Sequence, residues 1–193
     1  MGIEYELKFR ATKQQQAAIR QAFPGDTQTI SMETTYYDTP SGQLSARWYT
    51  LRRRLENGVS VCTLKAPAGD LGRGEWEVSC NSIEGSLLEL CKLSRKPELL
   101  VLTAEGLIPV CGARFTRIAQ ALTLGDTTAE LALDEGVLMG GGKEIPLCEV
   151  EIELKSGSRE TVLAFAKQLQ QDYGLVAEHG SKFRRALALY KGE

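Results

Sequence analysis

Acidic and basic side chains recur at every second residue in several segments of this chain, and they are sorted by sign. Carboxylates repeat at Glu149, Glu151 and Glu153, whereas guanidinium groups repeat at Arg52 and Arg54. In a β-strand, alternate residues share one face and lie about 7 Å apart, so each run is one face of a strand. The other members of this alternating set are Glu4, Glu6, Lys8, Arg10, Lys65, Glu75, Glu77, Glu130 and Asp134.

Such stripes restrict the chemistry that the two kinds of face can meet. Stacked carboxylates repel one another strongly where water is excluded, so they need either open solvent or a cation. Mg²⁺ prefers carboxylate oxygens. Stacked arginines and lysines instead need a polyanion that offers several oxygens to their donors. A metal-complexed chain of phosphates meets both demands, and the stripes therefore predict that the ionic faces converge on one channel.

The elements that would position these stripes follow from periodicity and turn signals. Alternation predicts strands over residues 2–10, 27–38, 46–56, 59–66, 74–80, 110–123, 128–138 and 146–155. Thr12 and Gln15 form a capping box for a helix that reaches about Phe23, and Asn57-Gly58 predicts a hairpin. Helical patterns cover residues 87–102 with a break at Pro97, residues 159–171, and a short stretch after Ser181. The class is therefore α+β with a predominantly antiparallel sheet.

Length and composition exclude several classes of protein. The chain has 193 residues, 42% of them hydrophobic, and a formal charge of −2, which indicates one domain over residues 1–193 and argues against nucleic-acid binding through bulk positive charge. No run approaches the roughly 20 apolar residues of a membrane span. The charged N-terminus and five scattered cysteines favour a cytoplasmic protein. Trp48 and Trp76 are interpreted as packing residues.

A series of short motifs resembles the CYTH superfamily, also called triphosphate tunnel metalloenzymes. Residues Glu4 to Lys8 resemble its N-terminal E-x-E-x-K motif. The further motifs, in the family's order, are Tyr36–Pro40, Leu51–Arg54, Thr63–Lys65, Arg73–Glu77, Leu133–Gly136, Glu149–Glu153 and Ser181-Lys182. The resemblance implies an eight-stranded antiparallel β-barrel, the triphosphate tunnel, with helices packed on the outside.

The resemblance also implies roles for individual residues. One or two Mg²⁺ or Mn²⁺ ions would be held by catalytic carboxylates, namely Glu4, Glu6, Glu149 and Glu151, with Glu153 on the same face and the choice between the three late glutamates open. Substrate phosphates would be bound by Lys8, Arg52, Arg54, Lys65, Arg117, Lys182 and Arg184, with Arg117 favoured over Arg114 for the inward position. The tunnel wall would be completed by Arg10, Glu75, Glu77, Glu130 and Asp134.

The expected activity is metal-dependent hydrolysis of a short polyphosphate, above all inorganic triphosphate to pyrophosphate and phosphate, without a protein nucleophile. Alternatives on the same tunnel are a class IV-type adenylate cyclase and a thiamine or nucleoside triphosphatase. A non-catalytic polyphosphate-binding module is the alternative from another class. The expected partner is a small anionic substrate, with no nucleic acid and no membrane, and the protein would be a monomer or a homodimer.

Overall fold

One curved, antiparallel β-sheet with five helices makes up the structure, a computed structural model that describes residues 2–3, 5–68 and 73–193. Glu4 lies outside the described residues. The strands are β1 (Gly2–Ile3), β2 (Glu6–Arg10), β3 (Thr27–Asp38), β4 (Thr50–Glu56), β5 (Val59–Pro67), β6 (Arg73–Ser79), β7 (Ile108–Leu124), β8 (Thr127–Gly140), β9 (Lys143–Ser156) and β10 (Val176–Ala177). The helices are α1 (Lys13–Ala22), α2 (Ile83–Ser94), α3 (Glu98–Leu102), α4 (Arg159–Tyr173) and α5 (Lys182–Lys191), with a short 3₁₀ turn at Ser45–Arg47. The predicted α+β class is confirmed.

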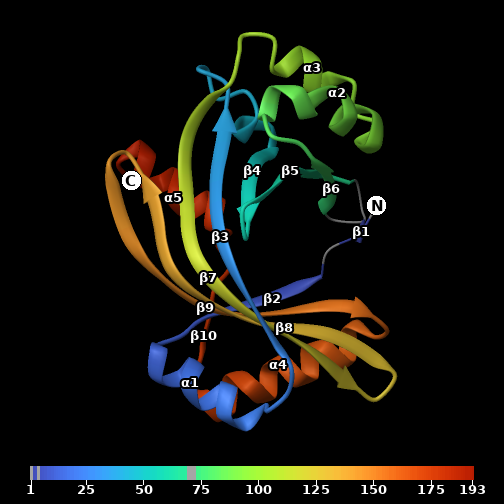
Figure 1. Cartoon of the computed structure of the whole chain (residues 1–193), viewed down its shortest axis with the longest axis vertical. Coiled ribbons are helices and arrows are strands. Elements are labelled where there is room, and N and C mark those ends of the chain that lie inside the picture. Colours follow the sequence, from blue (N-terminus) through green and yellow to red (C-terminus); the bar gives the residue numbers. More distant parts are fainter. Residues whose placement is uncertain (1, 4, 69–72) are drawn as a thin grey trace.

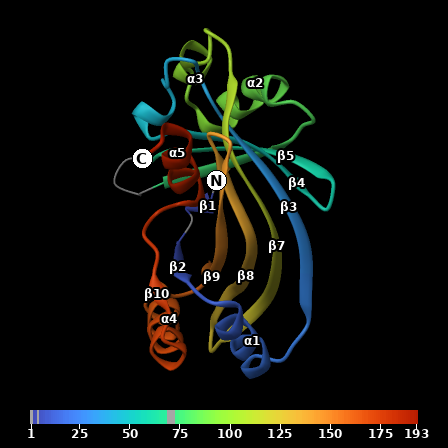
Figure 2. The same ribbon diagram turned by 90° about the vertical axis from the view of Figure 1, so that its left-hand side faces the viewer.

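The described strands pair in the order β1-β6-β5-β4-β3-β7-β8-β9-β2-β10. The described strands form a ladder of ten, so the predicted number of eight strands is wrong, and among the described residues no strand pairing closes this ladder into the predicted barrel. The N-terminal segment explains the difference, because it divides its pairing between the two ends of the sheet. Residues 2–3 pair with β6, whereas residues 6–10 pair with β9. The strong curl of the sheet is visible in two perpendicular views (Figures 1 and 2).

The turn at Asn57-Gly58 sets the register that directs the arginine stripe. Both residues have a positive φ, 49° and 85°, which is the conformation of a two-residue hairpin loop that follows the twist of the strands. Glu56 consequently pairs with Val59, and Arg52 pairs with Thr63. The predicted hairpin is confirmed.

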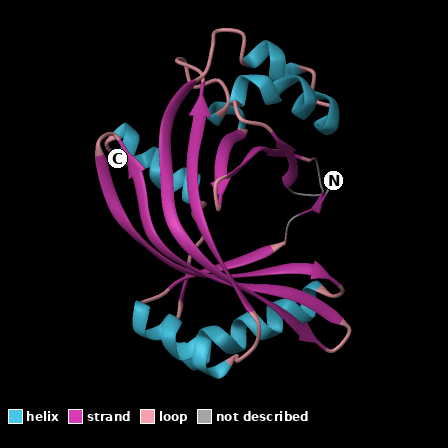
Figure 3. Ribbon diagram, in the orientation of Figure 1, coloured by secondary structure: helices cyan, strands magenta, loops and turns pink. Residues whose placement is uncertain are grey.

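Two pairs of helices cover the outer face of the sheet, at its two ends (Figure 3). α1 and α4 pack Ile19 and Val162 against the apolar face of β2, β8 and β9, which includes Phe9 and Ile152. The predicted capping box of Thr12 and Gln15 begins α1. α2 and α3 pack Leu90 and Leu99 against the outer residues of β4 to β6. The described helices contain no segment long and apolar enough to cross a membrane.

α5 departs from the expectation that every helix packs on the outside. Its Ala186 belongs to a cluster with Met32, Tyr36 and Leu138. Met32 and Tyr36 stand opposite Glu56 and Arg52 of β4, and Leu138 lies on the same face of β8 as Asp134. α5 therefore lies on the ionic face of the sheet. Gly140 allows this approach, because a Cβ there would lie 2.3 Å from the backbone oxygen of Ala186. The inner face is thus apolar beneath α5 and ionic beyond it.

Candidate functional site

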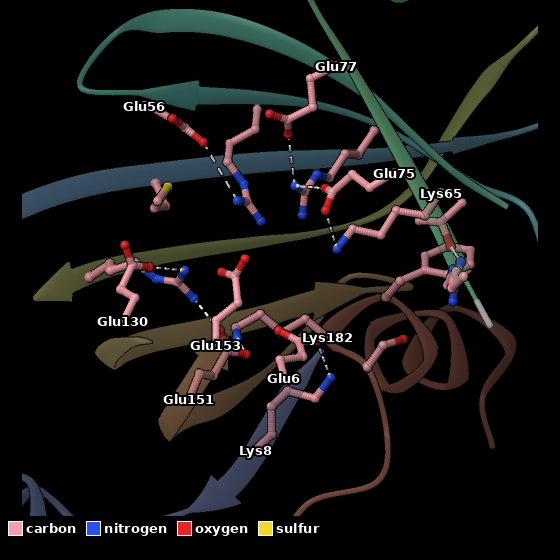
Figure 4. Close-up of a pocket in the computed structure, with 18 of the residues that line it drawn as sticks. Glu6, Lys8, Glu56, Lys65, Glu75, Glu77, Glu130, Glu151, Glu153 and Lys182 are labelled. Atoms are coloured by element: carbon pink, nitrogen blue, oxygen red, sulfur yellow. Dashed lines mark hydrogen bonds and ion pairs between the residues drawn. The ribbon is translucent and has the colours of Figure 1, made fainter. Parts of the chain in front are cut away.

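The ionic faces converge on a cavity of about 340 Å³ between β4–β6 on one side and β2, β8, β9 and the start of α5 on the other. Figure 4 shows the two walls, with Glu75, Glu77 and Lys65 opposite Glu6, Lys8 and Lys182. The charged residues that line the cavity are Glu6, Lys8, Arg52, Arg54, Glu56, Lys65, Arg73, Glu75, Glu77, Arg117, Glu130, Glu151, Glu153, Lys155 and Lys182. The predicted convergence of separate stripes is therefore what the geometry shows.

One wall gathers carboxylates from three neighbouring strands. Glu153 of β9 stands directly opposite Glu6 of β2 on one side and opposite Glu130 of β8 on the other. Like charges directly opposite one another destabilise a sheet, so this arrangement needs cations. Lys8 supplies one at 2.7 Å from Glu6, and Lys155 lies 2.8 Å from Glu153. Burial alone would lower the pKa of Lys8, but the charge and hydrogen bond of Glu6, together with the charge of Glu151, outweigh burial and raise it.

The facing wall gathers cations around two glutamates of β6. Glu75 lies 3.1 Å from Arg52 and 3.2 Å from Lys65, and Glu77 lies 3.6 Å from Arg52. Thr63 donates a hydrogen bond of 3.0 Å to Glu77. These contacts orient the two bases toward the cavity, as the tunnel-wall role of Glu75 and Glu77 implies.

Arg54 is a deeply buried cation of this site. Its Nε donates to Thr34 at 3.0 Å, and Glu56 lies 3.7 Å away. Burial, followed by the charge of neighbouring Arg52, lowers the pKa of Arg54 to about 10. A guanidinium in such surroundings gains from an incoming anion, because the anion offsets the charge that desolvation penalises.

At the start of α5, Lys182 inserts its ammonium among three carboxylates. Its Nζ lies 2.9 Å from Asp134, 2.7 Å from Glu149 and 2.6 Å from Glu151. The carboxylate oxygens of these three residues lie within 4.8 Å of one another, a spacing that could hold a metal ion. In this structure the ammonium of Lys182 is the cation between them.

Arg117 completes this cluster. It donates two hydrogen bonds of 2.7 Å to Asp134 and also contacts Glu151. Burial by itself would raise the pKa of Glu151, but Lys182 and Arg117 outweigh it and hold the pKa well below its usual range. Burial would lower the pKa of Lys182, but Glu151, Asp134 and Glu149 raise it instead. Glu151 and Lys182 are therefore both charged at neutral pH.

Four predicted site residues do not line this cavity. Glu149 and Asp134 lie behind its wall with no exposed surface. Arg10 has a side chain that is 62% exposed and lies 3.6 Å from Glu178. Arg184 is exposed, because Lys182 and Arg184 lie in a helix and residues two apart in a helix diverge. Glu4, also a predicted site residue, lies outside the described residues.

The inward position of Arg117 agrees with the interpretation that favoured it over Arg114, which lies 3.6 Å from Glu144 on the exposed side. Sequence reasoning missed three charged residues of the cavity. They are Glu56, Arg73 and Lys155. Each lies two residues from a charged residue already assigned to the ionic face of its strand. Because alternate residues of a strand share a face, the sequence pattern could have predicted them.

A second cavity, of about 980 Å³, adjoins the first and shares Glu6, Lys8, Thr50, Lys65, Arg73, Ser181 and Phe183 with it. Trp48 lines this second cavity with 68% of its surface exposed and φ of 63°. The interpretation of Trp48 as a packing residue is therefore wrong, because the loop between the 3₁₀ turn and β4 directs it outward. Trp76 is buried, as predicted.

Comparisons with known proteins agree with this architecture. The inorganic triphosphatase of Haemophilus influenzae is 27% identical over 166 residues, which cover 84% of this chain and 47% of that protein. The chain thus spans about half the length of this curated relative. Among solved structures, the PH1819 protein of Pyrococcus horikoshii superposes with a TM-score of 0.65 at 23% identity, covering 96% of this chain and 99% of that one.

A Hippeastrum protein, described as a putative adenylyl cyclase with a dominant triphosphatase activity, superposes with a TM-score of 0.66 at 21% identity. That match covers 98% of this chain and 95% of the other, and at this identity it shows a shared fold. The CYTH domain matches residues 2–187. Because this match spans nearly the whole chain, the protein belongs to the CYTH domain family.

Proposed function

We propose that this protein is a divalent-metal-dependent triphosphatase that cleaves inorganic triphosphate into pyrophosphate and phosphate. The observation that carries the proposal is the cavity in which lysines and arginines from β2, β4, β5, β7 and α5 face a group of carboxylates on β2, β8 and β9. The basic side chains can bind the several oxygens of a short phosphate chain, and the carboxylates can bind a hard cation complexed with that chain. The inorganic triphosphatase of Haemophilus influenzae supports the same assignment.

The chemistry of the donor set fits Mg²⁺ or Mn²⁺. Glu6, Glu151 and Glu153 line the cavity and would hold the ion, and Glu4 remains a fourth candidate on the sequence pattern alone. Glu149 is a weaker candidate, because its side chain has no exposed surface and does not line the cavity. When bound, the ion neutralises charge on the phosphate oxygens and makes a coordinated water more acidic.

The side chains of the cavity supply binding and orientation. Arg52, Arg54 and Lys65 would bind the non-bridging oxygens from one wall, and Lys8, Arg117 and Lys182 from the other. Phosphoryl transfer depends mainly on such positioning and on charge stabilisation. Glu153 would orient the attacking water, because it lines the cavity and is partly exposed, whereas Lys182 and Arg117 hold the carboxylate of Glu151.

Release of phosphate from inorganic triphosphate tests the proposal directly. The purified protein is assayed with Mg²⁺, with Mn²⁺ and with excess chelator. Metal-dependent release of one phosphate and one pyrophosphate per substrate is the expected result. A folded protein that hydrolyses no triphosphate with either metal would contradict it. Polyphosphate binding that is insensitive to chelator, without turnover, would support a non-catalytic binding module instead.

A triphosphate that carries an organic group is the second candidate substrate, and the second cavity favours it. This cavity opens from the phosphate site at Lys8 and Lys65 and presents the exposed ring of Trp48 together with His179 and Tyr190. Thiamine triphosphate and ATP are the probes. Trp48→Ala would raise KM for such a substrate and leave KM for inorganic triphosphate unchanged. Product analysis with ATP separates hydrolysis to ADP from cyclisation to cyclic AMP.

A further inference from the structure

Three cationic side chains of the site converge on one aromatic ring, that of Phe115 in β7. The Cζ atoms of Arg54 and Arg117 each lie 5.9 Å from the ring centroid, and the Nζ of Lys182 lies 5.3 Å from it. These cations come from β4, β7 and α5, so the ring is the point at which three separate elements of the site meet. All three separations fall within the range of cation–π attraction.

Convergence of like charges requires contacts that offset their repulsion, and carboxylates supply part of them at Arg117 and Lys182. Arg117 contributes to the lowered pKa of Arg54, after burial and Arg52, so the repulsion acts within this group. A carboxylate at the position of Phe115 would neutralise the cations, but it would also occupy the N–H donors that a phosphate needs. The face of an aromatic ring attracts a cation through its quadrupole and does not itself occupy any of these N–H donors.

Phe115 is held firmly in place. It is 4% exposed and packs in the apolar cluster beneath α5, at the border with the ionic half of the same face. Gly136 stands opposite it on β8. A Cβ at Gly136 would lie 2.1 Å from the backbone oxygen of Arg114 and 2.6 Å from the Cβ of Phe115, so any side chain there would displace β7 at Phe115. Gly136 belongs to the Leu133–Gly136 motif, and clearance for Phe115 is a physical reason for a glycine at its end.

We propose that Phe115 is a positioning residue for phosphate binding, whose ring holds Arg54, Arg117 and Lys182 together in the arrangement that a phosphate chain meets. The inference rests on the proposed function, because it concerns the same cavity. If the ring attracts the cations less strongly, the three cations spread apart in the free protein. They must then be brought together again when the substrate binds, which lowers the affinity. The ring acts through the cations and does not touch the substrate.

Progressive fluorination of Phe115 tests this role without changing the shape of the side chain much. The full chain is prepared with phenylalanine, 4-fluoro-, 3,5-difluoro- or 3,4,5-trifluorophenylalanine at position 115. Each fluorine weakens the negative face of the ring. The Kd of inorganic triphosphate is measured by calorimetry in chelator, and KM and kcat are measured with Mg²⁺. We expect log Kd to rise in step with fluorine number, to about tenfold weaker binding for the trifluoro variant, with KM following and kcat changing little.

Phe9 provides the matched control, since it is also 4% exposed but packs in the apolar cluster under α1 and α4. Trifluorophenylalanine at position 9 should leave Kd and KM unchanged. Equal affinities across the Phe115 series, in a wild-type protein that binds and hydrolyses triphosphate, would overturn the inference alone. A wild-type protein that neither binds nor hydrolyses triphosphate would instead overturn the proposed function. The two failures are therefore distinguishable.

Discussion

The ammonium of Lys182 lies 2.7 Å from Oε2 of Glu149, a carboxylate with no solvent-exposed surface. Arg185, one turn further along α5, contacts Oε1 of the same carboxylate. Glu149 thus ties the first turn of α5 to β9. A glutamate held in this way anchors the helix, and the cavity-lining Glu151 and Glu153 are left as the late carboxylates that can face a ligand.

Glu149→Gln should therefore act mainly on stability. Removing one member of a buried ion cluster leaves its partners undercompensated, and we expect a loss of about 3 kcal/mol in the free energy of unfolding. Urea unfolding followed by circular dichroism measures the loss. The residual activity of the folded fraction should keep the metal dependence of the wild type. Wild-type stability combined with a lost metal dependence would show that Glu149 is a metal ligand after all.

Glu6→Gln and Glu153→Gln should have the opposite profile. Both side chains line the cavity and are partly exposed, so their loss should cost little stability. We expect kcat for triphosphate to fall by about 100-fold or more, because each carboxylate is a proposed metal ligand. Glu89→Gln, an exposed change on α2, is the control and should leave kcat unchanged. Activity of either cavity variant close to that of the wild type would contradict the metal assignment.

Arg54→Lys should weaken substrate binding without removing a charge. A lysine lacks the planar set of N–H donors that binds phosphate oxygens in pairs, so KM for triphosphate should rise about tenfold. Arg53→Lys is a matched control, because Arg53 points to the opposite face and donates to Ser60 at 2.9 Å. Steady-state kinetics of the two variants decide the point. If the KM of Arg54→Lys for triphosphate equalled that of Arg53→Lys, Arg54 would not bind substrate.

The ion cluster at Lys182 predicts how stability depends on pH. Glu151 has a pKa below its usual range in the folded protein, so its contribution is present above its unfolded pKa, about 4.3, and is lost as pH falls further. Lys182 has a raised pKa, so its contribution is present below about pH 10.4, its unfolded pKa, and is lost only as pH rises through the folded value. We expect these two contributions to be flat from about pH 5 to 10.

Urea unfolding at a series of pH values measures this dependence. Below about pH 5 the free energy of unfolding should fall as pH falls, and we call this the acid limb. Glu151→Gln should make the acid limb shallower, since it removes one carboxylate whose pKa is lowered by the fold. Glu144→Gln, a change at an exposed pair with Arg114, should leave the limb as it is. An acid limb of equal steepness in wild type and Glu151→Gln would show that the cluster does not stabilise the fold.

Much of the architecture could be predicted because the signals involved are local. Alternation in β3 and β9, the capping box of Thr12 and Gln15, and the hairpin at Asn57-Gly58 each involve residues within a few positions of one another. Such patterns determine the type of an element and the face on which each side chain lies. They consequently predicted that Arg54, Glu151 and Lys65 would share one ionic surface.

The sequence by itself therefore determined which residues lie on the ionic faces, but only the tertiary structure decided what each of them meets there. The parity of Glu149 equals that of Glu151, yet α5 buries the first and leaves the second on the cavity. The N-terminal segment likewise divides its pairing between β6 and β9. Both outcomes depend on segments that are distant in sequence and meet only after folding. No local periodicity encodes the packing of such segments, because it arises from contacts between elements and not within them.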